Sequence, residues 1–170
     1  MTSTDRVDVL PLTTKGFALS GLKTWNAMEG TGYQFTLTHN RKRVAQVTND
    51  GNGGETRISW NAMYPNGKKD PRATKATFEA SVKAKEAFEA FVAEAPEVEM
   101  HGHSYKPNAG WVLEEMLNHH NLVKACRTAT LFRTTEGQEL TVRERFNPGV
   151  AAWIRKNYPG AVIYNEQLAA

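Results

Sequence analysis

The sequence predicts an α+β domain built on a mostly antiparallel sheet, and two observations carry this prediction. Segments in which apolar and polar residues alternate lie toward both ends of the chain, whereas the residues between them have helical spacing. Alternation with period two is typical of half-buried strands, and grouped helices favour an α+β domain over a parallel doubly wound sheet. The expected element order is ββββααββαβ. Two central helices and one C-terminal helix would pack on a sheet made from both ends of the chain.

The first part of the chain predicts a meander of four strands. The expected strands are residues 17–22, 33–38, 44–47 and 56–60. A polar turn joins the second strand to the third, and the loop 49–54 joins the third to the fourth. This glycine-rich loop lacks the calcium-loop pattern, and no helix follows it as in a phosphate loop, so a hairpin connection is favoured.

The middle of the chain predicts two helices. Residues 73–95 contain no Gly or Pro and place several phenylalanines on one face, and Pro96 follows the end of this helix. Asn108 can cap a second helix that runs to about Cys126. Strand patterns are expected only outside residues 73–126.

The last part predicts a hairpin, a helix and one more strand. Residues 130–133 and 140–146 alternate on either side of a turn. Asn147 and Pro148 have the pattern of an N-cap followed by proline in the first helical turn, for a helix through Tyr158. Residues 161–164 form the expected last strand.

Composition indicates one compact domain, residues 1–170, with residues 1–12 left as a flexible N-terminus. The chain has 170 residues, 40% of them hydrophobic, which is enough to bury a core. Its apolar runs are too short to span a membrane, and no signal peptide is evident. With a single cysteine, these features predict a cytoplasmic protein without a membrane partner.

Charge permits a nucleic-acid partner without requiring one. The net charge is +3, and residues 1–72 carry ten Lys/Arg against six Asp/Glu. Residues 73–108 are acidic, with four against six, and residues 109–170 carry seven against six. A dedicated duplex-DNA binder usually has a stronger cationic stripe.

Four of the five histidines and the only cysteine fall between His101 and Cys126, the densest set of groups that titrate near neutral pH. On the predicted second helix, Glu115, His119 and Cys126 share one line and are the catalytic candidates. His119 and Cys126 are separated by about 10.5 Å of helical rise, however, too far for a hydrogen bond. A buried Cys126 and a solvated Glu115–His119 pair are therefore favoured, and His120, within the apolar arc, is expected to be structural.

The same segment holds the candidate metal ligands His101, His103 and His119. An H-x-H spacing in an extended segment places both rings on one side, as in many zinc and iron sites. No ligand spacing of a known zinc motif is present, so we expect no metal and no cofactor.

Arginines supply the candidate anion-binding residues. Arg143 and Arg145 would alternate onto one face of the predicted strand 140–146, with Arg133 on the strand before it. Arg41 and Arg43 lie in the turn of the first meander. Guanidinium groups on one face bind phosphate or carboxylate in bidentate fashion, and neighbouring glutamates could instead neutralise them.

Two short blocks resemble small uncharacterised proteins encoded by bacteria and their phages. They are residues 32–54, with the Asn-Asp-Gly-Asn-Gly-Gly loop, and residues 126–133, Cys-Arg-Thr-Ala-Thr-Leu-Phe-Arg. The resemblance implies that the protein is encoded by a bacterium or its phage and acts in the bacterial host cell. It implies no activity and no catalytic residue.

Three classes of function remain. The lack of a motif that specifies a reaction favours a non-enzymatic accessory protein, encoded by a phage or mobile element, that binds a macromolecular partner, such as a counter-defence inhibitor that binds a protein. The alternative is a nucleic-acid or nucleotide-binding protein that uses the arginine-bearing strand. A second alternative is a small metal-dependent hydrolase built on His101, His103 and His119.

Overall fold

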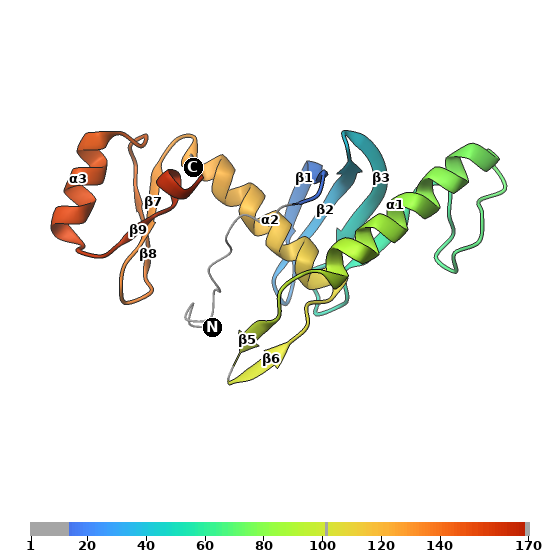
Figure 1. Cartoon of the computed structure of the whole chain (residues 1–170), viewed down its shortest axis with the longest axis horizontal. Helices are drawn as coiled ribbons and strands as arrows, with labels where there is room; N and C mark the ends of the chain where they lie inside the picture. Colours follow the sequence, from blue (N-terminus) through green and yellow to red (C-terminus); the bar gives the residue numbers. More distant parts are fainter. Residues whose placement is uncertain (1–13, 101, 169–170) are drawn as a thin grey trace. The chain divides into compact units, whose positions relative to one another are not determined.

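The structure, a computed structural model, describes residues 14–100 and 102–168 (Figure 1). Helices and antiparallel strand pairs confirm the α+β fold class. The elements in chain order are β1 (Phe17–Asn26), β2 (Thr31–His39), β3 (Lys42–Asn49), β4 (Arg57–Trp60), α1 (Lys75–Ala93), β5 (Val98–Met100), β6 (His103–Tyr105), α2 (Ala109–Cys126), β7 (Thr130–Arg133), β8 (Glu139–Val142), α3 (Pro148–Asn157), β9 (Val162–Ile163) and α4 (Tyr164–Gln167).

The chain divides into two compact units, and the boundary falls within α2, after Met116. The described residues of the N-terminal unit are 14–100 and 102–116, and those of the C-terminal unit are 117–168. That the chain is one compact domain stays a prediction. Residues 1–12, which the sequence predicts to be flexible, lie outside the described residues. No helix in the described part of the chain is long and apolar enough to cross a membrane.

The strands of the described residues lie in three separate sheets, so the prediction of one sheet made from both ends of the chain is wrong. The four strands of the meander pair in the order β1-β2-β3-β4, and the C-terminal strands pair in the order β8-β7-β9. The expected element order also lacked the hairpin of β5 and β6 and the four-residue helix α4. Each end of the chain has enough apolar residues to form a core of its own. α1 packs on the meander, and α3 packs on the C-terminal sheet.

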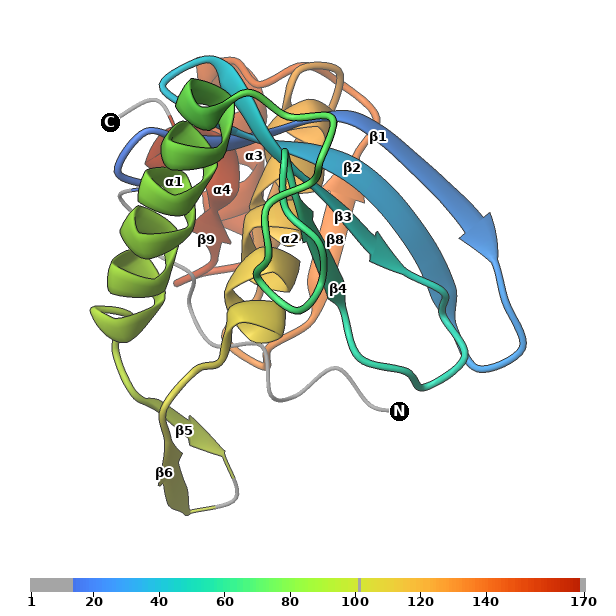
Figure 2. The same cartoon turned by 90° about the vertical axis from the view of Figure 1, so that its right-hand side faces the viewer.

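Aromatic side chains fasten α1 to one face of the meander, here called the inner face (Figure 2). Phe17 on β1 lies at the centre: its ring stacks on His39, with centroids 4.3 Å apart, and contacts Phe88 at 5.3 Å and Phe91 at 5.7 Å. The rings of Phe88 and Trp60 are 5.8 Å apart. The Phe-rich helical face predicted from the sequence is therefore the face that packs on the sheet.

Two loops at one end of the meander lock together through glycines. Gly51, in the β3–β4 loop at φ +77°, lies so close to the β1–β2 hairpin that a Cβ there would lie 2.5 Å from the Gly32 nitrogen. The same Cβ would lie 2.8 Å from the Ala27 Cβ. The Met28 N–H also donates to Asn52 Oδ1 (3.2 Å). The loop 49–54 therefore joins two strands as predicted and also clamps the neighbouring hairpin.

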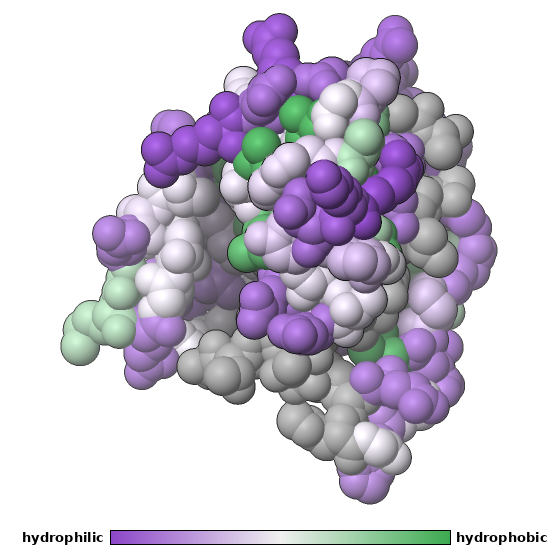
Figure 3. Space-filling view, turned by 90° about the vertical axis from the view of Figure 1, so that its left-hand side faces the viewer, coloured by the Kyte–Doolittle hydropathy of each residue, from purple (hydrophilic) through white to green (hydrophobic). Residues whose placement is uncertain are grey.

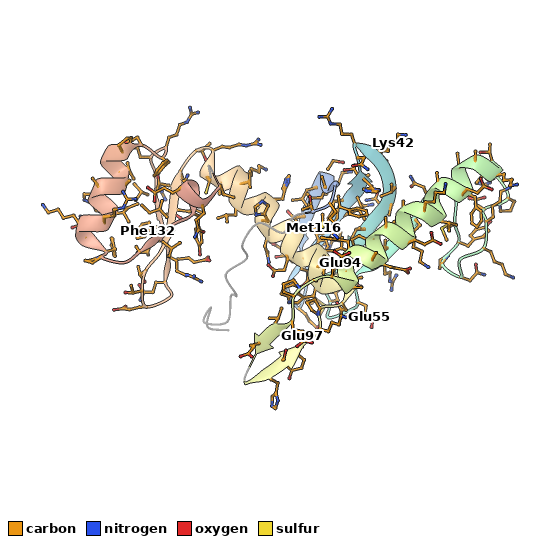
Figure 4. All side chains as sticks on the ribbon, in the orientation of Figure 1. Lys42, Glu55, Glu94, Glu97, Met116 and Phe132 are labelled. Atoms are coloured by element: carbon orange, nitrogen blue, oxygen red, sulfur yellow. The ribbon has the colours of Figure 1, made fainter. Side chains whose placement is uncertain are left out.

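The C-terminal unit has its own apolar core between α3 and the three-stranded sheet. Phe132 on β7, labelled in Figure 4, packs with buried residues of α3 and β9. Asn147 caps α3 as predicted, accepting a hydrogen bond from the Val150 N–H (3.0 Å), and Pro148 begins the helix. The buried residues of this core are Phe132, Val150, Ala151, Ile154 and Ile163.

A buried amide holds the connection between α2 and β7. Asn165 Nδ2 donates to the carbonyl oxygens of Cys126 (3.0 Å) and Ala129 (3.0 Å), and its Oδ1 accepts from the Leu131 N–H (2.9 Å). One side chain thus satisfies the last carbonyl of α2, which lacks a partner within the helix, and two backbone groups between α2 and β7 or on β7 itself.

Candidate functional site

The structure does not assemble the catalytic candidates on α2 into a reactive centre. The helix is continuous to Cys126, so His119 and Cys126 remain about 10.5 Å apart along its axis. Burial raises the pKa of the Cys126 thiol, and a backbone hydrogen bond from Leu131 offsets part of this rise. The thiol is therefore protonated at neutral pH and is a poor nucleophile. Glu115 lies one helical turn before His119, and both residues are partly buried instead of forming the solvated pair that the sequence favoured.

The sequence placed His120 within the apolar core, and this expectation is wrong: the residue is only partly buried and lies outside that core. Burial lowers its pKa, and the positive charges of Lys124, Arg127 and His119 lower it further. The imidazole is consequently neutral at pH 7.

Among residues 14–100 and 102–168, no group of three His, Cys, Asp or Glu side chains could hold a metal ion. His103 is exposed on β6, with its ring 6.4 Å from that of Tyr105. His101 lies outside the described residues, so a site that includes it stays a hypothesis.

Arg143 and Arg145 do not lie on a strand, and this part of the arginine hypothesis is wrong. β8 ends at Val142, because the chain then bends toward the Asn147 cap: Thr130 Oγ1 donates to the Glu144 carbonyl oxygen (2.9 Å). Both arginines are exposed, in the irregular segment between β8 and α3 instead of on one face of a sheet. Arg133 is partly buried on β7. The side of the molecule drawn in Figure 3 is largely hydrophilic, with only small hydrophobic areas.

A polar cluster in the N-terminal unit has a structural role. The Tyr33 hydroxyl and Thr56 Oγ1 are 2.8 Å apart, and Asn49 Nδ2 donates to the same Thr56 oxygen (3.1 Å). Burial raises the pKa of Tyr33, and the Glu114 carboxylate raises it further, so the phenol stays protonated at neutral pH. The cluster ties β2 to the β3–β4 loop.

The most distinctive surface is the face of the meander opposite α1, here called the outer face. Strand register places one row of side chains straight across all four strands: Lys23, Gln34, Thr48 and Arg57. The next row is Ser20, Thr36, Gln46 and Ser59. Ala18, Thr38 and Arg43 continue the face at one end, and Trp25 beside Gly32 ends it at the other.

Two β-bulges turn cations onto this face. Between Ser20 and Lys23 the register shifts, because Gly21 and Leu22 together lie opposite one residue of β2. Strict alternation from Ser20 would place Lys23 and Trp25 on the inner face. A second bulge, at Val44, moves Arg43 to the outer face, where its Nη2 donates to Thr36 Oγ1 (3.3 Å).

The positive charge of the outer face has no carboxylate beside it. Lys23, Arg43 and Arg57 are exposed, and no Asp or Glu occupies any position of the face. Among the described residues, none of these three cations forms an ion pair, whereas Lys75 and Lys85 pair with glutamates on α1. Arg41 and Lys42 extend the charge into the β2–β3 turn, and Figure 4 shows Lys42 at the opposite end of the meander from Glu55.

Sequence reasoning found Arg41 and Arg43 but missed Lys23 and Arg57. A signal was present, because the polar positions of β2 and β3 are Gln34, Thr36, Gln46 and Thr48, without a carboxylate. The bulges hid the rest, since alternation alone assigns Lys23 and Arg43 to the wrong face.

No family model matches the chain, and the searches of curated proteins and of solved structures find no match either. The fold and the outer face therefore carry the functional argument.

Proposed function

We propose that this chain is a non-enzymatic binding protein that uses the outer face of its four-stranded sheet to bind a negatively charged macromolecule. The supporting observation is the segregation of charge on this face. Lys23, Arg43 and Arg57 stand among Ser, Thr and Gln side chains with no carboxylate between them. Cations that form no ion pair with a carboxylate of their own chain can pair with an external anion.

The chemistry of the face suits binding without a reaction. Guanidinium groups form bidentate hydrogen bonds with phosphate or carboxylate, and the ammonium group of Lys23 adds a compact charge. The amides of Gln34 and Gln46 offer both donors and acceptors. The protonated Cys126 thiol and Tyr33 phenol agree with a role without catalysis.

We also propose four finer features that the sequence predicts. They are an origin in a phage or mobile element, a counter-defence role, a protein partner and a cytoplasmic location. An acidic protein and a nucleic acid both offer the negative charge that this surface requires.

Charge reversal tests the outer face directly. In the double variant Lys23→Glu, Arg57→Glu, we expect affinity for fluorescently labelled heparin to fall about tenfold or more, because two attractive contacts become repulsive. The matched control, Lys68→Glu with Lys83→Glu, makes the same charge change at exposed lysines off the face and should change the affinity little.

Binding is measured by fluorescence anisotropy, with circular dichroism to verify that each variant is folded. Equal losses in the two double variants would overturn the proposal, because net charge alone would then explain binding. A larger loss in Arg143→Glu, Arg145→Glu would overturn it in favour of the exposed bend before α3.

A further inference from the structure

We propose that the negatively charged partner is a single-stranded nucleic acid and that Trp25 stacks on one of its bases. This inference rests on the proposed function and assigns the partner of the same face. It depends on where the fold places one indole ring.

Trp25 lies on the outer face, backed by the sheet itself. A Cβ on Gly32 would lie 2.2 Å from Trp25 Nε1 and 2.3 Å from its Cε2, so the indole takes the space that a side chain at Gly32 would need. Its Nε1–H donates to the Asp50 carbonyl oxygen (3.3 Å), which fixes the ring against the β3–β4 loop. The side chain nevertheless remains 40% exposed. A supported and accessible aromatic ring is the arrangement that stacks on nucleic-acid bases.

The rows beside Trp25 supply the groups that a strand of nucleic acid needs. Lys23 and Arg57 lie at the two ends of one row, three strand spacings apart, or about 14 Å. Gln34 and Thr48 stand between them and can hydrogen-bond base edges or sugars. Phosphates would contact the two cations and Arg43, while one unstacked base reaches the indole.

Carboxylates mark where this surface ends. Glu29, Asp50 and Glu55 lie in the two interlocked loops beyond Trp25. They would repel phosphates and keep the nucleic-acid backbone over the cationic rows.

The indole of Trp25 favours a single-stranded nucleic acid over a duplex or an acidic protein as the partner. In a duplex the base faces are stacked inside the helix, so Trp25 would gain nothing from it, whereas bases of a single strand can be splayed onto aromatic rings. An acidic protein would use the cations and would have no particular need for the ring. A charged face that carries one supported indole therefore favours a single strand.

The probe is a labelled oligothymidylate of about 12 nucleotides, a length within the usual site size for such surfaces. We expect it to bind more tightly than a duplex of equal length. The variant Trp25→Leu should bind it about tenfold more weakly and Trp25→Phe should retain most of the affinity, since stacking needs an aromatic ring. The matched control is Trp153→Leu, which removes a tryptophan that is 50% exposed in the C-terminal unit, and it should bind as wild type does.

Two further readouts separate stacking from charge. Oligothymidylate should quench the part of the intrinsic fluorescence that is lost in Trp25→Phe. Three phosphate contacts should also lower the affinity about twentyfold between roughly 50 and 200 mM salt.

The outcomes distinguish this inference from the proposed function. Loss of oligothymidylate binding in the Lys23, Arg57 double variant, with unchanged binding in a folded Trp25→Leu, would overturn stacking and leave the proposed function standing. Tighter binding of the duplex would also overturn the inference. Binding of polyglutamate without binding of either nucleic acid would overturn it in favour of an acidic protein partner.

Discussion

Asn165 shows how one residue can determine the local structure around it. Its amide is buried, and its three hydrogen bonds all go to the backbone between Cys126 and Leu131. Sequence reasoning gave this residue no role, because an asparagine after a short strand is as compatible with an exposed turn. Only the pairing of β7 with β9 brings it to the end of α2.

Replacing Asn165 with alanine should destabilise the protein by about 2–4 kcal/mol, because two carbonyls and one N–H then lose their partner inside the protein. Thermal or urea unfolding measures this change. Asn157→Ala is the matched control: its Nδ2 donates to the Trp153 carbonyl oxygen (2.8 Å), but the residue is exposed, so the expected loss is small. Equal losses in both variants would contradict the importance of burial.

At the scale of elements, the helices were predicted well because their signals are local. Helical spacing and the absence of Gly and Pro placed α1 within two residues at each end, and the Asn147–Pro148 pair placed the start of α3. The β5–β6 hairpin was missed because each strand has only three residues, and the exposed β6 shows no apolar alternation. Bulges were missed because they depend on the partner strand.

The interlocked loops give a prediction for the meander. Gly51→Ala should destabilise the protein by about 2–4 kcal/mol, since a Cβ there meets both an unfavourable φ of +77° and the backbone of Gly32. The control Gly67→Ala has nearly the same φ, +79°, but nothing within 4 Å, and should cost about 1 kcal/mol. Chemical denaturation measures both values, and equal costs would show that the close approach of the loops contributes nothing.

At the scale of the whole molecule, the division into two units could not be read from the sequence. Boundaries between compact units usually fall in polar, flexible linkers. Here the boundary lies inside α2, whose helical pattern continues without interruption from Ala109 to Cys126. One sheet shared by both ends was expected because alternating segments lie toward both ends of the chain, and alternation does not specify which strands pair.

Because each unit has its own core, a cavity made in one core should accelerate hydrogen exchange mainly in that unit. Phe88→Ala should accelerate amide hydrogen exchange most in β1 and β4, because it removes the ring that contacts Phe17 and Trp60 and holds α1 on the meander. Ile154→Ala should accelerate exchange most in β7 and β9, which share its core. Hydrogen exchange followed by mass spectrometry measures both patterns. Equal acceleration of all four strands by either variant would contradict the division.

Asn165 also sets the order of events while the chain is being made. The amide follows its three backbone partners by 34 to 39 residues in the sequence. At about 5–20 residues per second, a ribosome adds Asn165 roughly 2–8 s after those partners. Until then the carbonyl oxygens of Cys126 and Ala129 lack the hydrogen bonds that Asn165 donates, so a newly made C-terminal unit should stay open to proteases and chaperones until this residue leaves the ribosomal tunnel.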